Sequence, residues 1–193
     1  MEIEAIWGKQ FRSYASAVTS MRLSIFREWP YFYAGDEKVE ADYSRLYAES
    51  SNSLLIIGRE NGKIIGVTTG LPLEELDPFY LTPFQKRSVH SFFYLGEILL
   101  LKEFRGRGLG LQMHAAFESE VRKQARYNKI YILRILCDPK DPRKPKEDPD
   151  LDRFWHRLGY IERADLNLEI EYQEIGRDSP SLHLFQYSFK DIG

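Results

Sequence analysis

Apolar and polar side chains alternate over residues 1–7, which is the period of a strand with one exposed face. Over residues 11–29 apolar side chains recur at steps of three and four, and this spacing predicts a helix. Pro30 ends that helix, because proline has no N–H group to donate to the preceding turn. A second helix is predicted over residues 40–50.

The next segment carries a strong turn signal. Asn61-Gly62 lies between the apolar runs 54–57 and 64–67, and this dipeptide favours the tight turn of a β-hairpin. Residues 71–89 contain three prolines among aromatic and charged residues, which predicts a long connection with a helical turn. Residues 92–101 are almost all apolar, as in a central strand covered on both faces.

Helices and strands alternate again in the second half of the chain. An apolar stripe over residues 109–125 predicts an amphipathic helix, and a β-rich run follows at 130–137. Residues 138–150 are dense in proline and charge, so they continue neither element. The remaining predicted elements are a helix over 151–158 and strands over 166–175 and 182–189. The order β-α-α-β-β-β-α-β-α-β-β predicts one α/β domain over residues 1–193, with a mixed sheet and flanking helices.

Composition narrows the class of protein. Hydrophobic residues make up 43% of the chain and charged residues 29%, as in a soluble globular domain. Lys and Arg (27) nearly balance Asp and Glu (29), so no global field favours nucleic acid or an anionic membrane. The single cysteine, Cys137, excludes an internal disulfide, and the first residues lack an export-signal pattern. We expect a cytoplasmic protein without nucleic-acid or membrane partners, and without a metal, because the histidines lack metal-ligand spacing.

The junction between the apolar strand and the amphipathic helix holds the most specific chemistry. It reads Arg105-Gly106-Arg107-Gly108-Leu109-Gly110, and backbone N–H groups at a helix start are unpaired and favour an anion. The glycines admit a ligand close to the backbone and the arginines add cationic donors, which suits a pyrophosphate. A tight turn without a ligand is the alternative. A dinucleotide fingerprint would need a small residue at Leu111, and a Walker loop would need Gly-Lys-Ser/Thr, so neither NAD nor ATP is favoured.

This loop resembles the pyrophosphate signature of the GCN5-related N-acetyltransferase (GNAT) superfamily: Gln or Arg, two residues, Gly, one residue, then Gly or Ala. Residues 97–104 look like the family's central strand. Phe154-Trp155-His156-Arg157-Leu158-Gly159-Tyr160 looks like its Phe-Tyr-x-x-x-Gly-Phe segment. The predicted order of elements is also similar to that of the family. The resemblance implies a single-domain GNAT-like fold, with a mixed, largely antiparallel central sheet flanked by helices.

The resemblance also implies an activity. We expect an N-acetyltransferase that uses acetyl-CoA to acetylate a primary amine of a small molecule or peptide, by direct attack in a ternary complex. The cofactor would contact the backbone of Leu99 and Leu101 and the loop residues Arg105, Gly106, Arg107, Gly108, Leu109 and Gly110. A non-catalytic CoA-binding sensor and an acyltransferase with a different acyl-CoA stay open as alternatives. A homodimer is compatible with this reading.

Glu97 is the candidate general base. It lies in the apolar strand, on the face expected to carry Phe93, Leu95, Leu99 and Leu101. Burial there would raise its pKa towards the range of a base that works near neutral pH, and it would deprotonate the acceptor ammonium directly or through water. The alternative is a structural carboxylate that an N–H group, a hydroxyl or an arginine satisfies in the core.

Two further segments bear on the expected site. The family's usual proton donor to the thiolate is the Tyr that Trp155 replaces here, and an indole cannot act as that acid. His156 is ionisable, but on a helix it points about a hundred degrees away from Trp155, so a surface or structural role is favoured. Tyr31, Phe32 and Tyr33 follow the first helix, where the family commonly builds its acceptor pocket, and plain packing is an equal alternative.

Overall fold

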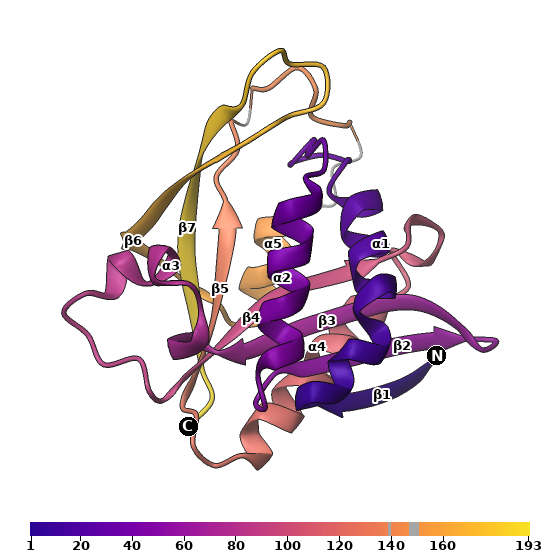
Figure 1. Ribbon diagram of the computed structural model, residues 1–193, viewed down its shortest axis with the longest axis vertical. Coiled ribbons are helices and arrows are strands. Elements are labelled where there is room, and N and C mark those ends of the chain that lie inside the picture. Colours follow the sequence, from indigo (N-terminus) through magenta and orange to yellow (C-terminus); the bar gives the residue numbers. More distant parts are fainter. Residues whose placement is uncertain (139, 147–150) are drawn as a thin grey trace.

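The computed structural model describes residues 1–138, 140–146 and 151–193 and holds one seven-stranded sheet. The strands are β1 (Glu2–Trp7), β2 (Leu54–Glu60), β3 (Lys63–Pro72), β4 (Phe92–Leu100), β5 (Lys129–Ile135), β6 (Ile161–Tyr172) and β7 (Ser181–Asp191). Their order across the sheet is β1-β2-β3-β4-β5-β7-β6 (Figure 1). Within these described strands β4 and β5 pair in parallel, and every other neighbouring pair is antiparallel.

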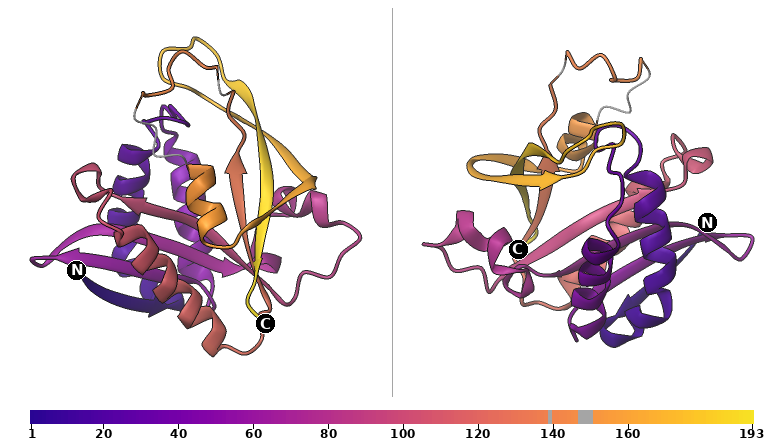
Figure 2. Two further views of the ribbon diagram at one scale, coloured as in Figure 1. Left: turned by 180° about the vertical axis from the view of Figure 1, so that it is seen from behind. Right: turned by 45° about the horizontal axis from the view of Figure 1, so that its top comes forward.

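Helices cover both faces of the sheet. One face carries α1 (Ala15–Ile25) and α2 (Glu37–Glu49), and the other carries α4 (Leu109–Lys123) and α5 (Leu151–Arg157) (Figures 1 and 2). The short α3 (Pro78–Leu81) lies in the long connection between β3 and β4. The predicted element order and the mixed, largely antiparallel sheet are confirmed. None of the helices in the described ranges is long and apolar enough to cross a bilayer.

Several predicted boundaries move. The first helix ends at Ile25, before Pro30 is reached, so Pro30 is not what ends it. Three of the other shifts have a local reason. The first helix is preceded by a 3-10 helix over Gly8–Tyr14, so regular α-helix starts only at Ala15. The second begins at Glu37 instead of Glu40, because the Asp36 side chain accepts a hydrogen bond from the N–H of Val39 (3.0 Å) and caps it. β6 starts at Ile161 instead of Leu166, since its first residues are mostly charged and hide the strand period. Residues 139 and 147–150 of the predicted loop 138–150 lie outside the described residues.

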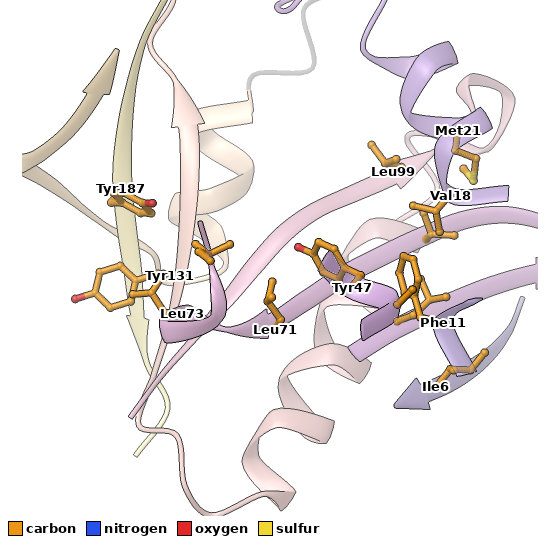
Figure 3. Close-up of a cluster of buried hydrophobic side chains, with 14 of the residues drawn as sticks. Ile6, Phe11, Val18, Met21, Tyr47, Leu71, Leu73, Leu99, Tyr131 and Tyr187 are labelled. Atoms are coloured by element: carbon orange, nitrogen blue, oxygen red, sulfur yellow. The ribbon is translucent and has the colours of Figure 1, made fainter. Parts of the chain in front are cut away.

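The sheet separates two apolar cores. Strand residues on one face pack against α1 and α2, and Figure 3 shows this core from Ile6 of β1 to Tyr187 of β7, with Leu99 of β4 on the same side. The second core lies between the sheet and α4, with Phe117 fully buried at its centre. β4 is central, so its side chains are shared between the two cores.

A β-bulge in β4 decides which core each of its residues joins. Thr69 of β3 is paired with Glu97, but the next residue, Gly70, is paired with Leu95, so Gly96 has no opposite partner. The alternation therefore shifts by one residue: Phe93 and Leu95 face α4, whereas Glu97 and Leu99 face α1 and α2. The expectation that Glu97 shares a face with Phe93 and Leu95 is wrong, because a strict two-residue period ignores a bulge.

Glycine is required at the bulge by its surroundings. A Cβ atom on Gly96 would lie 2.5 Å from the Tyr47 hydroxyl and 2.8 Å from the Thr69 hydroxyl, both closer than such contacts occur in proteins. The hydroxyl of Tyr43 would be 3.3 Å away. The bulge thus brings the backbone of β4 against polar groups of α2 and β3 and places the next residue, Glu97, beside them.

His114 on α4 makes stability depend on pH. The side chain is 1% exposed, and its Nε2 lies 3.0 Å from the Tyr160 hydroxyl. Burial and the Lys190 charge lower its pKa to about 4, against about 6.5 in an unfolded chain. The unfolded chain therefore binds this proton more tightly, and the stability that neutral His114 contributes is lost as pH falls from 6.5 towards 4. We expect the free energy of unfolding to fall by about 2 kcal/mol through this group between pH 7 and pH 5.

Urea unfolding at both pH values checks this expectation. His114→Gln keeps an amide nitrogen within reach of Tyr160 and cannot titrate, so the variant should lose less stability than the parent over the same interval. Equal losses in parent and variant would contradict the assignment.

Candidate active site

β4 and β5 are paired only near their starts. The paired residues are Phe92–Tyr94 of β4 and Lys129–Tyr131 of β5, after which the strands continue unpaired and separate (Figure 1). β5 keeps its other edge on β7, and β4 keeps its other edge on β3. The facing edges beyond Tyr94 and Tyr131 therefore carry main-chain groups without a strand partner, and an extended ligand can pair with such groups as another strand would.

The alternation of the backbone identifies which β4 groups face this opening. The N–H of Leu101 donates to the Ile65 carbonyl of β3 (3.0 Å), so it points away from β5. Residues two apart in a strand point their N–H groups the same way, so that of Leu99 is also directed at β3. The expected backbone donors Leu99 and Leu101 are therefore wrong by one residue. Ile98 and Leu100 direct their N–H groups to the opening, and the Leu100 carbonyl correspondingly accepts from Arg105 Nε (2.9 Å).

The glycine-rich loop leaves the start of α4 open to an anion. Gly106 and Gly108 have φ values of 74° and 73°, a left-handed conformation that glycine adopts without steric cost. Gly108 precedes the first helical residue, no side chain caps this end, and the first turn holds no acidic residue. The first bond of the helix runs from Gln112 N–H to the Gly108 carbonyl (3.3 Å). The N–H groups of residues 109–111 thus lack a helical partner and are available to a phosphate.

Both loop arginines are engaged by carboxylates. Arg105 Nη1 lies 2.6 Å from Glu28, while its Nε holds the end of β4. Arg107 Nη2 lies 2.7 Å from Glu60, and this contact lowers the pKa of Glu60. The pairs are partly exposed, so water competes for them and a phosphate can replace either carboxylate. The backbone N–H groups of residues 109–111 therefore have no partner within the helix, whereas both arginines already contact a carboxylate.

α5 lies next to the loop. A Cβ on Gly110 would contact the Phe154 ring at 3.6 Å, which explains why glycine or alanine suits this position. Trp155 is half-buried and packs edge-on against Tyr160 at 5.3 Å between centroids. His156 is exposed, with Nε2 3.3 Å from Glu162, in agreement with the favoured surface role. Neither residue supplies a hydroxyl in place of the family's Tyr.

Glu97 is buried in a polar cluster. It is 8% exposed, its Oε2 lies 2.5 Å from Arg22 Nη1, and its Oε1 accepts from the Tyr43 hydroxyl at 2.5 Å. Tyr43 also contacts the Thr69 hydroxyl (2.7 Å). Burial raises the pKa of Glu97, and the Arg22 charge and the Tyr43 hydrogen bond offset part of the rise. The alternative role for Glu97, a structural carboxylate, requires a partner such as a hydroxyl or an arginine. Both kinds of partner are present around Glu97.

Sequence reasoning missed Arg22 and Glu40. Arg22 of α1 is 9% exposed and Glu40 of α2 is 2% exposed. Arg22 directs Nε (2.7 Å) and Nη2 (3.3 Å) at the two Glu40 oxygens. The sequence does contain a signal for Arg22, because it lies beside Met21 in the apolar stripe of the first helix. An arginine buried there needs a buried partner.

The segment 31–33 lies partly near this cluster. Tyr31 is shielded from water, which raises the pKa of its hydroxyl, and the negative charge of Glu97 adds to that rise. Tyr33 pairs by its backbone with Glu174, and burial together with the charge of Glu40 raises the pKa of its hydroxyl to about 12. Tyr31 is therefore the member of the segment that lies near Glu97. Cys137 is exposed, because β5 ends two residues earlier.

Across the described ranges of the chain, no group of three or more His, Cys, Asp or Glu side chains is arranged to hold a metal ion. Among the described residues, two surface hollows lie away from this opening. The first is bordered by Arg27 and Glu37 and the second by Phe84 and Arg87, and Glu97 borders neither. Neither hollow is lined by residues of β4 or β5.

The chain resembles known proteins both in its sequence pattern and in its fold. Residues 21–160 match the sequence pattern described as Acetyltransferase (GNAT) family. No curated protein sequence matches the chain significantly. Three solved structures share its fold over nearly all of both chains. One is smu.2055 from Streptococcus mutans UA159, with 15% sequence identity, a TM-score of 0.63 and 99% of each chain covered. The others are a ribosomal-protein-alanine N-acetyltransferase from Brucella melitensis (12% identity, TM-score 0.61, 100% of each chain covered) and an aminoglycoside 6'-N-acetyltransferase complexed with coenzyme A (12% identity, TM-score 0.61, 99% of this chain and 97% of that chain covered). The matched pattern covers more than half of the residues, so the chain belongs to the acetyltransferase (GNAT) family.

Proposed function

We propose that the chain transfers an acetyl group from acetyl-CoA to a primary amine of a small molecule or peptide, by direct attack in a ternary complex. One observation carries the proposal: the unpaired edge of β4 at Ile98 and Leu100 leads directly to the uncapped start of α4. Coenzyme A is an amide-containing arm joined to a pyrophosphate, so its two parts match these two adjacent features. A relative of the same fold is named as complexed with coenzyme A.

Two of the chemical requirements, oxyanion stabilisation and removal of the amine's proton, have a candidate in the chain. Acetyl-CoA supplies the activated thioester. In this proposal the Ile98 N–H donates to the oxygen that becomes negative during attack, which is the role of an oxyanion-hole donor. Glu97, the neighbouring residue, takes the proton from the acceptor ammonium, directly or through water. No residue is assigned as proton donor to the thiolate, because a thiolate is a tolerable leaving group and Trp155 has no acidic hydroxyl.

Two observations favour a second candidate, a non-catalytic CoA-binding sensor. Trp155 replaces the tyrosine of the family segment, and both oxygens of Glu97 are engaged by Arg22 and Tyr43. A protein with these properties could bind the cofactor and fail to turn it over. An acyltransferase that prefers a different acyl-CoA is the third candidate.

Thermal unfolding with CoA, acetyl-CoA and longer acyl-CoA species separates these candidates. At a ligand concentration of 100 times Kd, binding stabilises by about 2.7 kcal/mol, which for a chain of this length raises Tm by roughly 5–10 °C. Thiol release is then followed across a panel of primary amines. Release with acetyl-CoA supports the proposal, and release with longer acyl donors alone supports the third candidate. Stabilisation without release on any amine supports the sensor, and no stabilisation by any CoA species would overturn all three.

A further inference from the structure

One guanidinium donates hydrogen bonds to two buried carboxylates between α1, α2 and β4. Arg22 directs Nε and Nη2 at Glu40 and Nη1 at Glu97, so each carboxylate has its own edge of the planar group. Its Cζ lies 3.6 Å from the centre of the Tyr43 ring, which fixes the plane from one side. All three charged side chains are at most 10% exposed.

The charges of this cluster do not balance. With both carboxylates ionised, Glu40 and Glu97 carry two negative charges against the one positive charge of Arg22. A buried group with unbalanced charge tends to take up a proton, whereas a carboxylate in an exclusive pair with arginine resists protonation. The proton affinity of Glu97 therefore depends on how much of the Arg22 charge Glu40 neutralises.

We infer that Glu40 is a positioning residue that holds Arg22 by its Nε–Nη2 edge and so leaves Glu97 able to accept the proton of the acceptor ammonium. This inference rests on the proposed role of Glu97 as general base. It explains how one carboxylate is both fixed by an arginine and basic enough to act. Glu40 does not touch the reacting atoms and acts only through Arg22.

The other titratable groups around Glu97 stay neutral near physiological pH. Tyr43 contacts Glu97 directly. Burial, with the charge of Glu97 adding to it, raises the pKa of four tyrosine hydroxyls from the segment after α1, from α2 and from β4: Tyr31, Tyr43, Tyr47 and Tyr94. From β3 the cluster receives the uncharged hydroxyl of Thr69. Glu40, Arg22 and Glu97 itself are thus the charged groups that decide whether Glu97 holds a proton.

Two substitutions are expected to move the titration of Glu97 in opposite directions. Glu40→Gln removes one negative charge, so protonated Glu97 would leave Arg22 uncompensated and the pKa of Glu97 should fall. Arg22→Gln leaves two carboxylates without a cation, so the pKa should rise. The acidic limb of kcat/KM should move by about one pH unit or more, downward in Glu40→Gln and upward in Arg22→Gln. The plateau of Glu40→Gln should also fall roughly tenfold, because a weaker base transfers the proton less readily.

Carboxyl carbon NMR of Glu97 in the free protein gives a readout that does not need turnover. It should show the same opposite shifts, while Glu37→Gln, which removes an exposed charge from the same helix, should move neither readout. If the Glu97 carboxyl titrates at the same pH in Glu40→Gln as in the parent, the inference is overturned. If that variant does not fold, the upward shift in Arg22→Gln decides, and its absence overturns the inference equally. Full turnover in Glu97→Gln would instead remove the proposed base, whatever the NMR titration shows.

Discussion

Gly108→Val is expected to abolish measurable stabilisation by acetyl-CoA. Gly108 has φ 73°, a conformation in which a β-branched residue is strained, and it is the residue from which α4 starts. Relief of that strain turns the first N–H groups of the helix, and the added methyl groups occupy the space in front of them. Two lost hydrogen bonds to a charged phosphate, at about 1.5–3 kcal/mol each, would raise Kd by at least about 100-fold. Thermal shift and calorimetric titration with acetyl-CoA measure the change.

The strain itself must be separated from the loss of the ligand site. Gly176, in the turn between β6 and β7, is a matched control, because its φ is 79° and nothing lies within 4 Å of an added Cβ, as at Gly108. Gly176→Val should lower Tm by a similar amount and still respond to acetyl-CoA. If Gly108→Val bound acetyl-CoA as tightly as the parent, the anion site would lie elsewhere and the proposed function would lose its main support.

Much of this fold follows from the period of apolar residues. The stripe over residues 109–125, the hairpin at Asn61-Gly62 and the apolar run over 92–101 all predict elements that the structure contains. A bulge at Gly96 reverses the faces of β4, and the two-residue period carries no sign of it, because the bulge depends on contacts with Tyr47 and Thr69 from other elements.

The candidate site could likewise be predicted only in part from the sequence. The loop 105–110 is contiguous, so its glycines and the start of the helix could be predicted together. The partners of Glu97 come from two helices that lie more than 50 residues earlier in the chain, and no local pattern relates Arg22, Glu40 and Tyr43 to it. The choice of Leu99 and Leu101 as backbone donors failed for a related reason: the direction of an N–H group depends on the register with β3, which the strand sequence alone does not define.

Glu97→Gln is expected to lower kcat by roughly 100- to 10,000-fold, the usual contribution of a general base. Glutamine has the same shape, and its one amide oxygen can still accept from Arg22, whose charge Glu40 continues to balance. Its NH2 group then donates to the Tyr43 hydroxyl, which can turn its own hydrogen towards Thr69. The cofactor features at Ile98, Leu100 and α4 are unchanged, so Kd for acetyl-CoA should stay close to that of the parent. The remaining activity should also lose the acidic limb of its pH profile, because the titrating group is gone.

Loss of a partly buried ion pair could by itself impair an enzyme, so Glu118→Gln serves as the control. Glu118 on α4 is 15% exposed and pairs with Lys190 (2.5 Å) and Arg122 (2.9 Å), on the face opposite Glu97. It should lose stability and retain turnover. If Glu97→Gln matched the parent in kcat at every pH while losing stability like Glu118→Gln, the Arg22–Glu97 contact would be structural. The amine would then be deprotonated by solvent before it binds, and the rate at low pH would follow the acceptor's own pKa instead of a group on the protein.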